Sequence, residues 1–403
     1  MQDWRIIMLT LEKVKHAASV LDGVARKTPL ISAPTLTNSC DLYLKCEDLQ
    51  LTGSFKLRGG YYKISQLSEE EKSHGVIACS AGNHAQGIAL AAQRSGTKAV
   101  ICMPASAPVA KVEATRSYGA EVVLVEGVYD DAARRATELQ KEKGYTFAHP
   151  FNDVDVMAGQ GTIGLEIMEQ LKDVDAVVVP IGGGGLISGI SFAVKTINPN
   201  CKVYGVQSEG APGMAVSFKN KKITECDAKT IADGIQVKMP GDLTFEMVSK
   251  YVDDVVTVSE NEIASAMLAL AEKSKIVAEG AGATPVAAVL FNKLPVQGKK
   301  VVCVVSGGNV DINTYTKVLT RGLTYTGRMA KVTVEMADKS SQLPEILAAV
   351  AATGANIIGV TFDRARTQGD VTSCAVELTM ETKNFEHIEE IKTALSSKGF
   401  QVC

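Results

Sequence analysis

The sequence predicts an α/β protein with two lobes, each built on a parallel sheet, followed by a smaller antiparallel α/β domain. Three observations predict this fold class. Short β-rich runs alternate with helical stretches over residues 74–125, a second such series follows from residue 175, and the pattern changes near residue 330. With 403 residues the chain is too long for one core. Ligands of two-lobed α/β proteins usually bind between the lobes, so we expect a cleft there.

Both series consist of continuous apolar strands separated by helices, a pattern that is typical of parallel sheets covered on both faces. The first series predicts strands over residues 75–80, 98–103 and 121–125, with helices over 84–94 and 109–118. The second predicts strands over 175–180, 202–207, 255–258 and 300–305, with a helix over 186–195.

The tail of about 75 residues has a different order, βαββαβ, which predicts a separate antiparallel sandwich. Its expected strands are 331–336, 355–364, 371–380 and 399–402, and its helices are 342–352 and 385–397. Residues 322–328, which contain Thr, Tyr and Gly, are expected to be the linker.

Composition and charge exclude several classes of protein. The formal net charge of −3 gives no basic footprint for nucleic acid or an anionic membrane surface. No apolar run reaches 18 residues, and the first residues lack the apolar core of a signal peptide. Nine cysteines, an odd number without a Cys-x-x-Cys pair, indicate reduced thiols and a cytoplasmic location. No His/Cys cluster has the spacing of a metal site.

Lys56 lies in the stretch Thr-Gly-Ser-Phe-Lys-Leu-Arg-Gly-Gly, residues 52–60. The glycines there allow the backbone to approach a ligand closely, and Phe55 offers a ring-lined, partly desolvated site. Desolvation lowers the pKa of a lysine and frees its amine to condense with an aldehyde. An ordinary loop lysine after a turn is the alternative for this segment alone.

Four glycines, residues 182–185, stand between a strand and a helix. Such a run turns several backbone N–H groups toward one anion at the positive end of a helix. No Lys or Arg lies between Lys172 and Lys195, so amides rather than a local cation must hold that anion. A tight turn is the alternative, but a tight turn requires one or two glycines rather than four in succession.

Two further motifs follow strands. Ser80-Ala81-Gly82-Asn83-His84 opens a helix, and its free amides suit a carboxylate or a ring hydroxyl. A capped turn is an equal alternative, with His84 as a packed residue. Ser306-Gly307-Gly308-Asn309 ends the last strand of the second series, where open α/β sheets bind ligands, although a plain turn also explains it.

Together these four motifs resemble the pyridoxal-phosphate-dependent threonine/serine dehydratases of the tryptophan-synthase-β-like fold (fold type II). The order and spacing match over about residues 10–320. The resemblance implies a catalytic domain over 8–325, with a small lobe of about 50–155 inserted in the large lobe. The tail, 329–403, resembles a single ACT domain, an amino-acid-sensing module. The match is best to catabolic threonine ammonia-lyases that carry one such domain.

The resemblance also implies a role for each position in binding pyridoxal 5'-phosphate and the substrate. Lys56 is the lysine that joins the cofactor and removes the Cα proton, and Ser54 assists near the phosphate and leaving group. The implied cofactor contacts are Phe55 on the ring, Asn83 at the 3'-hydroxyl, Ser306 at the ring nitrogen, Gly182, Gly183, Gly184, Gly185 and Leu186 at the phosphate, and Gly234 and Glu279 at the flanks. The implied substrate-carboxylate loop is Ser80, Ala81, Gly82, Asn83 and His84.

The implied reaction is β-elimination of L-threonine to 2-oxobutanoate and ammonia, with L-serine giving pyruvate. A neutral serine at the ring nitrogen favours elimination over transamination. Serine racemases of this family carry a Ser where this chain has Ala81, and cysteine synthases follow the lysine with Asp-Arg rather than Leu57-Arg58. A racemase, a β-replacing synthase and a non-catalytic amino-acid sensor are the rivals. We expect no metal at the position of the family's divalent-cation site, because Glu209 fits but its partner position is Ala215.

The resemblance further implies regulation and assembly. ACT modules bind amino acids near segments such as Ser340-Ser341-Gln342-Leu343-Pro344 and Gly354-Ala355-Asn356-Ile357. We therefore expect an amino-acid or nucleotide effector and a homo-oligomer, a dimer or a tetramer. A purely structural tail domain is the alternative.

Overall fold

The computed structural model describes residues 9–339, 341–364 and 372–402. Within them the chain divides into two compact units, with the division between Asp311 and Ile312. The first unit contains two parallel-sheet lobes and the second contains an antiparallel sheet with helices, so the predicted fold class is confirmed. The domain boundary that we expect at 325–329 stays a prediction.

The large lobe is built on a six-stranded sheet in the order β1-β2-β10-β7-β8-β9, in which only β1 is antiparallel to its neighbour. The register aligns Val305 of β10 with Cys46 of β2, so these two strands end side by side. The strands are β1 (Leu30–Ser32), β2 (Asp41–Cys46), β7 (Ala176–Pro180), β8 (Lys202–Ser208), β9 (Asp254–Val258) and β10 (Lys300–Val305). Their carboxyl ends present the loops after β2, β7 and β10 along one edge.

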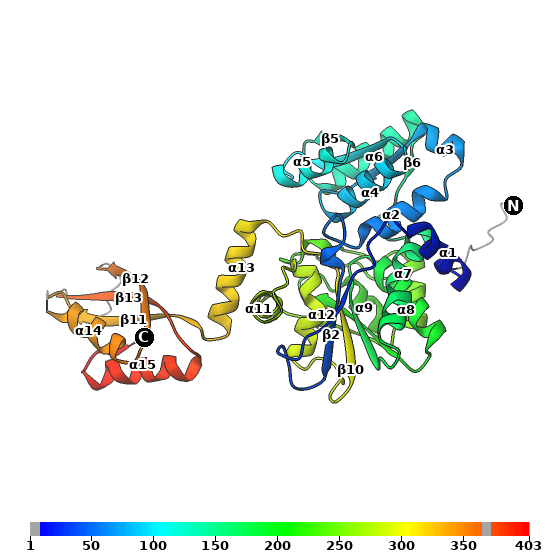
Figure 1. Ribbon diagram of the computed structural model, residues 1–403. Helices are drawn as coiled ribbons and strands as arrows, with labels where there is room; N and C mark the ends of the chain where they lie inside the picture. Colours follow the sequence, from blue (N-terminus) through cyan, green and yellow to red (C-terminus); the bar gives the residue numbers. More distant parts are fainter. Residues whose placement is uncertain (1–8, 340, 365–371, 403) are drawn as a thin grey trace. The chain divides into compact units, whose positions relative to one another are not determined.

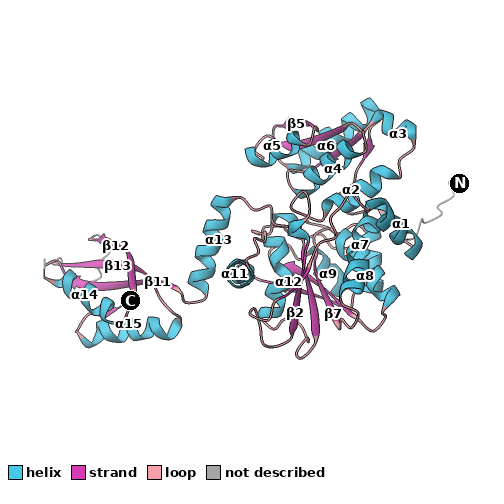
Figure 2. Ribbon diagram, in the orientation of Figure 1, coloured by secondary structure: helices cyan, strands magenta, loops and turns pink. Residues whose placement is uncertain are grey.

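Helices cover both faces of this sheet (Figure 2). On one face α12 packs against β7, β8 and β10, and on the other α8 packs against β7 and β8 and pairs with α7. The strands are rich in valine, because residues buried on both sides of a parallel sheet need to be apolar throughout. The helices are α1 (Leu11–Leu21), α7 (Val154–Gln170), α8 (Gly185–Ile197), α9 (Gly213–Asn220), α10 (Asp242–Tyr251), α11 (Glu260–Ala269) and α12 (Gly280–Leu290).

The small lobe is inserted between β2 and β7 in sequence and has its own four-stranded parallel sheet, in the order β5-β4-β3-β6. In Figure 1 it forms the upper, blue to cyan part of the first unit. Its strands are β3 (Val76–Cys79), β4 (Ala99–Pro104), β5 (Glu121–Val125) and β6 (Thr146–Phe147). Its helices are α3 (Glu69–His74), α4 (Asn83–Arg94), α5 (Val109–Ser117) and α6 (Tyr129–Lys143).

Helix α2 (Lys56–Ser65) joins the two lobes, because it packs against α4 of the small lobe and α7 of the large lobe. A side chain on Gly159 of α7 would come within 2.6 Å of the Gly59 Cα atom, so these helices touch backbone to backbone. The alternative of a loop lysine is contradicted, because Lys56 begins helix α2. Gly59 and Gly60 pack closely against α7 and α4, and the expected close approach of the backbone to a ligand stays a prediction.

The second unit contains helix α13 (Ile312–Tyr325) and the predicted βαββαβ series. The sheet order is β12-β13-β11-β14 and all its pairs are antiparallel. The series is β11 (Met329–Ala337), α14 (Gln342–Ala352), β12 (Asn356–Asp363), β13 (Ser373–Glu381), α15 (Phe385–Ser397) and β14 (Gln401–Val402). The expected linker at 322–328 is wrong in its first half, because α13 continues to Tyr325 and buries Gly322. The expected site residue Ser340 and the start of the expected strand 371–380 lie outside the described residues.

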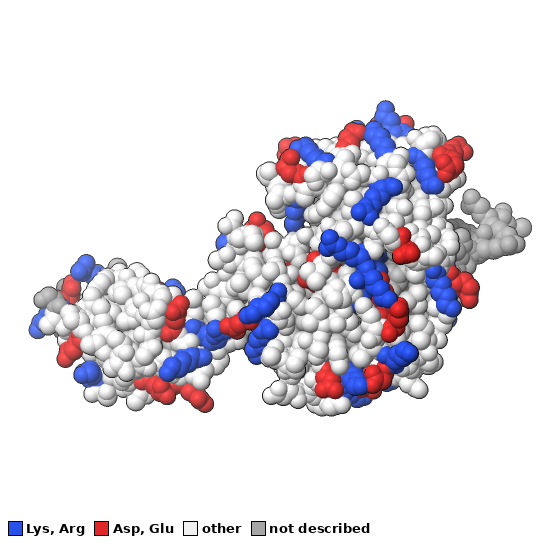
Figure 3. Space-filling model, in the orientation of Figure 1, with Lys and Arg blue, Asp and Glu red and all other residues white. Residues whose placement is uncertain are grey.

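The surface agrees with the mixed charge of the sequence. On the face shown in Figure 3, basic and acidic side chains alternate over the first unit, with no extended area of one sign. Among the described residues no helix is both long and apolar enough to cross a membrane. The expected cytoplasmic location stays a prediction.

The α7–α8 crossing gives a stability prediction. A side chain on Gly189 of α8 would come within 2.2 Å of the Met157 carbonyl oxygen, which is backbone and cannot move aside easily. We expect Gly189→Ala to lower the free energy of unfolding of the first unit by about 1–3 kcal/mol through overpacking. Thermal denaturation followed by circular dichroism measures this. The control is Gly359→Ala, whose methyl group would meet nothing closer than 3.5 Å, and equal effects of the two would contradict the prediction.

Candidate active site

The site begins where the segment before α2 meets the end of β10. Ser54 and Gly307 form an antiparallel bridge. The Phe55 N–H donates to the Ser306 carbonyl oxygen at 3.1 Å, and the Gly308 N–H donates to the Gly53 carbonyl oxygen at 2.9 Å. Ser306 is itself buried. Two of the four predicted motifs are thus joined by backbone hydrogen bonds.

Lys56 occupies the first position of α2, directly after the N-cap residue Phe55. Its Nζ donates to the Pro150 carbonyl oxygen at 2.9 Å and lies 5.2 Å from the centroid of the Phe55 ring. Burial lowers the pKa of the Lys56 amine to about 8, and the Glu279 carboxylate opposes part of this shift. A larger share of the amine is therefore neutral near pH 7 than for an exposed lysine.

The tetraglycine loop follows β7 and has no room for side chains. A Cβ atom on Gly183 would come within 2.3 Å of the Phe151 ring, and one on Gly185 within 2.8 Å of the Phe151 Cα. Gly184 has φ +101°, which L residues with side chains rarely adopt. Helix α8 starts at the last glycine of this loop, and in the described part of the chain no side chain caps its first turn. Its amides are available to an anion at the positive end of the helix.

Asn83 starts α4 and reaches from the small lobe to the large lobe. Its Nδ2 donates to Glu279 Oε1 at 2.7 Å, and its Oδ1 accepts from Asn309 Nδ2 at 2.8 Å. Burial raises the pKa of Glu279 to about 7, with a further contribution from the Asp233 carboxylate, while the bond from Asn83 opposes the rise. A Cβ atom on Gly234 would lie 3.2 Å from Glu279 Oε1, so Gly234 is also at this site.

The segment 80–84 lies at the end of β3 and forms the start of α4. The Gly82 N–H donates to Ser80 Oγ at 3.2 Å, and Gly82 is an N-cap without a side-chain bond to the helix. The His84 ring contacts the Ala148 carbonyl oxygen at 2.8 Å. Burial lowers the pKa of His84 to about 3, so the ring is neutral and packed. The backbone amides around Ala81 remain the groups of this segment suited to a carboxylate.

These residues fit a phosphate-bearing aldehyde cofactor. Ser54 is fully buried, and its Oγ finds no hydrogen-bond partner among the described residues. A buried hydroxyl without a partner costs free energy unless a ligand supplies one. The uncapped glycine loop suits a phosphate, and the Lys56 amine suits an aldehyde. In the described part of the chain no group of three or more His, Cys, Asp or Glu residues could hold a metal ion.

Sequence reasoning missed several residues of the site. Phe151 and Thr244 support the glycine loop, and Thr244 Oγ1 donates to the Gly183 carbonyl oxygen at 2.6 Å. Lys111 of α5 pairs with Asp233 at 2.7 Å and links the two lobes beside Glu279. No local pattern marks these residues. Asn309 stands in a motif that we noted, but its bond to Asn83 depends on the tertiary fold.

Comparison with known proteins decides the family. Residues 21–307 match the family described as "Pyridoxal-phosphate dependent enzyme". The chain belongs to this family. The predictions that the chain is an enzyme and that its cofactor is pyridoxal phosphate are thereby confirmed.

Relatives within the pyridoxal-phosphate-dependent family confirm the resemblance to threonine dehydratases. An L-threonine ammonia-lyase from Thermotoga maritima is 50% identical over 398 residues, covering 98% of this chain and 99% of that protein. The solved structure of threonine deaminase isoform 2 from Solanum lycopersicum matches with TM-score 0.74 and 38% identity, covering 77% of this chain and 87% of that one. The solved structure of maize serine racemase matches with TM-score 0.73 and 35% identity, covering 78% of this chain and 98% of that one.

The raised pKa of Glu279 predicts a pH-dependent stability in the cofactor-free protein. A carboxyl group whose pKa is raised in the folded state stabilises the fold fully below its ordinary value of 4.5, and this contribution is lost as pH rises through about 7. Glu279→Gln removes this dependence but keeps an acceptor for Asn83. The free energy of unfolding of the wild type minus that of the variant should fall by roughly 2–3 kcal/mol between about pH 5 and about pH 8.

Urea denaturation of both proteins at the two pH values measures the difference. Exposed Glu70→Gln is the matched control for the loss of one carboxylate. A difference between the wild type and the Glu279 variant that stays constant with pH would contradict the prediction.

Proposed function

We propose that the chain is a pyridoxal-phosphate-dependent L-threonine ammonia-lyase that releases 2-oxobutanoate and ammonia, and that it also converts L-serine to pyruvate and ammonia. The observation that carries this proposal is the Lys56 amine, held between the Phe55 ring and the Pro150 carbonyl with a lowered pKa, at the end of the sheet that also presents the glycine loop. The names of the relatives in Thermotoga maritima and Solanum lycopersicum support the substrate.

In this proposal the following residues would hold the cofactor. Lys56 would join it covalently, Phe55 would lie against its ring, Asn83 would bind its 3'-hydroxyl and Ser306 would face its ring nitrogen. Gly234 and Glu279 would flank it. Gly182, Gly183, Gly184, Gly185 and Leu186 would bind its phosphate through amides at the start of α8. When bound, the cofactor supplies an electron sink for the electrons of the substrate's Cα–H bond.

The remaining steps are assigned to side chains and amides of the chain. The amides of residues 80–84, at the start of α4, would hold the substrate carboxylate. The Lys56 amine, in its neutral form, would accept the Cα proton as the base. Ser54, whose hydroxyl has no hydrogen-bond partner among the described residues, would give its proton to the β-hydroxyl as it leaves as water, and the Lys56 ammonium, which carries the Cα proton, would reprotonate Ser54. Hydrolysis of the released enamine, after it tautomerises, consumes one water and yields the 2-oxoacid and ammonia.

The alternatives differ from this proposal at specific residues. Racemisation needs a proton donor on the face of the substrate opposite Lys56, and Ala81 offers no such group. A β-replacing synthase needs a second nucleophile such as a thiol, so its turnover would depend on added thiol. A non-catalytic sensor would have no need to keep Lys56, Asn83, Ser306 and the glycine loop together.

Substitution of Lys56 tests the proposed mechanism. We expect Lys56→Ala to lose the visible absorbance of bound cofactor in the freshly purified protein. It should also lower 2-oxobutanoate release from L-threonine by at least about 1,000-fold, because the covalent link and the base are lost together.

The control is Lys72→Ala, whose lysine pairs with Glu69 on the exposed face of α3 and lies outside the site. Assays on L-serine with and without a thiol, with D-serine measured in parallel, separate the lyase from a synthase and a racemase. Full activity of Lys56→Ala would refute the mechanism.

We further propose that an amino-acid or nucleotide effector tunes the enzyme through the βαββαβ domain, and that the enzyme is a homo-oligomer. A hollow of about 350 Å³ on this domain supports the effector site. Charges of both signs line it, which suits the ammonium and carboxylate groups of an amino acid. Its lining includes Gln342, Glu345, Glu335, Lys398 and Ser373. The expected segment 354–357 does not contribute to this lining.

The effector proposal predicts a change in activity with candidate ligands. We expect isoleucine, valine, serine or a nucleotide such as AMP to change the KM or kcat for threonine. Glu345→Gln should raise the half-maximal concentration of an amino-acid effector about tenfold, because one charge-assisted hydrogen bond is lost. Initial rates over a range of effector concentrations measure both. No response to any candidate would support a purely structural domain.

A further inference from the structure

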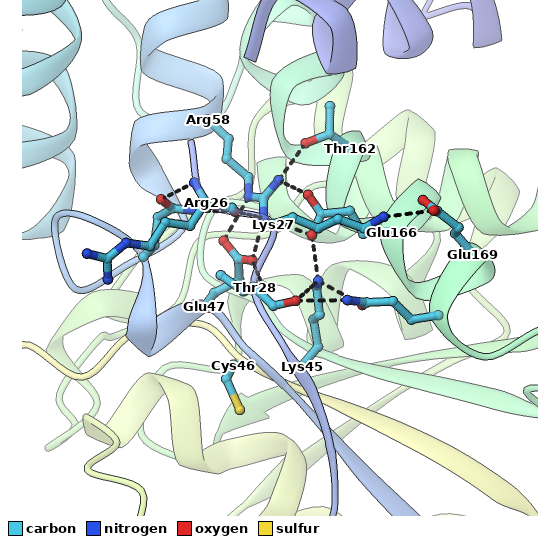
Figure 4. Close-up of polar contacts among 12 residues, drawn as sticks. Arg26, Lys27, Thr28, Lys45, Cys46, Glu47, Arg58, Thr162, Glu166 and Glu169 are labelled. Carbon is cyan, nitrogen blue, oxygen red and sulfur yellow. Dashed lines mark hydrogen bonds and ion pairs between the residues drawn. The ribbon is translucent and has the colours of Figure 1, made fainter. Parts of the chain in front are cut away.

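Four charged side chains are buried together near the start of α2: Lys45, Glu47, Arg58 and Glu166 (Figure 4). The side chains of Lys45 and Glu47 are fully buried, that of Arg58 is 2% exposed and that of Glu166 is 15% exposed. Two positive and two negative charges cancel, which lowers the cost of burying them. The proposed reaction uses none of the four, so the cluster has another role.

Arg58 makes the largest number of contacts in this cluster. Its Nε and Nη2 donate to the Glu47 carboxylate at 2.9 and 2.8 Å. Its Nη1 donates to Glu166 Oε1 at 2.5 Å and to Thr162 Oγ1 at 3.2 Å. Its Nη2 also donates to the Arg26 carbonyl oxygen at 3.0 Å. The planar guanidinium thus bridges two carboxylates at once, which an ammonium group does less well.

Lys45 belongs to the same cluster, but among the described residues its Nζ bonds to α7 and to the segment before β1 rather than to α2. Its Nζ donates to Glu166 at 2.5 Å, to the Thr28 carbonyl oxygen at 2.7 Å and to Gln170 at 3.0 Å. These bonds join β2 to α7 and to the segment before β1. Lys45 and Arg58 therefore share Glu166, yet only Arg58 connects the cluster to α2.

Arg58 lies close to Lys56 in the chain, so its contacts bear on the position of that lysine. Arg58 lies in the first turn of α2, two residues after Lys56, and its side-chain partners come from the end of β2 and from α7 of the large lobe. At the same turn, a Cβ atom on Gly87 of α4 would come within 2.9 Å of the Lys56 backbone. The turn that carries Lys56 is thus packed by the small lobe and tied by Arg58 to the large lobe.

We propose that Arg58 is a positioning residue: through Glu47 and Glu166 it holds the first turn of α2 against the large lobe, so that the Lys56 amine keeps its place relative to Ser306 and the glycine loop. Buried ion pairs rarely add stability over apolar residues of similar size, so geometry rather than stability accounts for this cluster. The inference rests on the role of Lys56 proposed above.

The test compares Arg58→Lys with Lys45→Met in the cofactor-loaded, full-length enzyme. Arg58→Lys keeps the charge but loses the two-carboxylate bridge. We expect kcat for threonine to fall about 10- to 100-fold, because a misplacement of about 1 Å costs about that much. KM should stay within about twofold, and the visible absorbance of bound cofactor should be retained. Lys45→Met also removes a partner of Glu166, but it leaves the Arg58 bonds to Glu47, Glu166 and Thr162, so its kcat should stay within about twofold.

A second measurement does not depend on activity. In the cofactor-free protein, amide hydrogen exchange followed by mass spectrometry should be faster over residues 54–65 in Arg58→Lys than in the wild type and in Lys45→Met. If Arg58→Lys does not fold, Thr162→Val removes one Arg58 contact without changing charge, and it should shift kcat and exchange in the same direction by a smaller factor.

The inference is overturned if Arg58→Lys, or Thr162→Val in its place, keeps wild-type kcat and exchange. It is also overturned if Lys45→Met lowers kcat as much as the Arg58 variant. A wild-type enzyme that releases no 2-oxoacid would instead refute the proposed function, while the exchange measurement would still test the Arg58 link.

Discussion

The site depends on the short backbone pairing between the segment before α2 and the end of β10. The Ser54–Gly307 bridge and the bond from the Phe55 N–H to the Ser306 carbonyl set where helix α2 begins. The Lys56 amine, the Ser54 hydroxyl and the Ser306 loop are all placed by these contacts. The identities of the side chains at the site matter only when this main-chain pairing has formed, because the pairing determines where the Lys56 amine lies.

Buried charged side chains occur around Lys56 and around Arg58, and the two groups differ in how completely the charges are paired. Around Lys56 the charges are left incompletely compensated, so burial moves the pKa values of Lys56 and Glu279 toward neutrality. Around Arg58 each charge has an oppositely charged partner within hydrogen-bond distance, and under the proposal above this pairing positions α2. The two sites lie within one turn of the same helix. Buried charged residues two positions apart in one helix thus differ in how completely their charges are paired.

The sequence predicted the parallel strands and the βαββαβ order well, because valine-rich runs and glycine punctuation are local signals. It predicted Lys56, the glycine loop and Ser306 as one site only through their resemblance to a family. It could not predict that Gly59 meets Gly159, that Asn83 bonds Glu279 and Asn309, or that Arg58 joins two carboxylates. Apart from Arg58–Glu47, whose residues are 11 positions apart, these contacts join residues about 100 or more positions apart, and no local pattern encodes them.

The insertion of the small lobe between β2 and β7 has a consequence for how the chain folds. Strand β2 finds its central partner, β10, only after the whole small lobe and most of the large lobe have been synthesised. The small lobe, with its own continuous sheet, can form during translation. At that stage the edge of β2 that pairs with β10 is still unpaired. Assembly of the Lys56 site is then among the last events of folding. Until β10 is synthesised, β2 and β7 lack this partner, and unpaired strand edges are sites at which a nascent chain can aggregate.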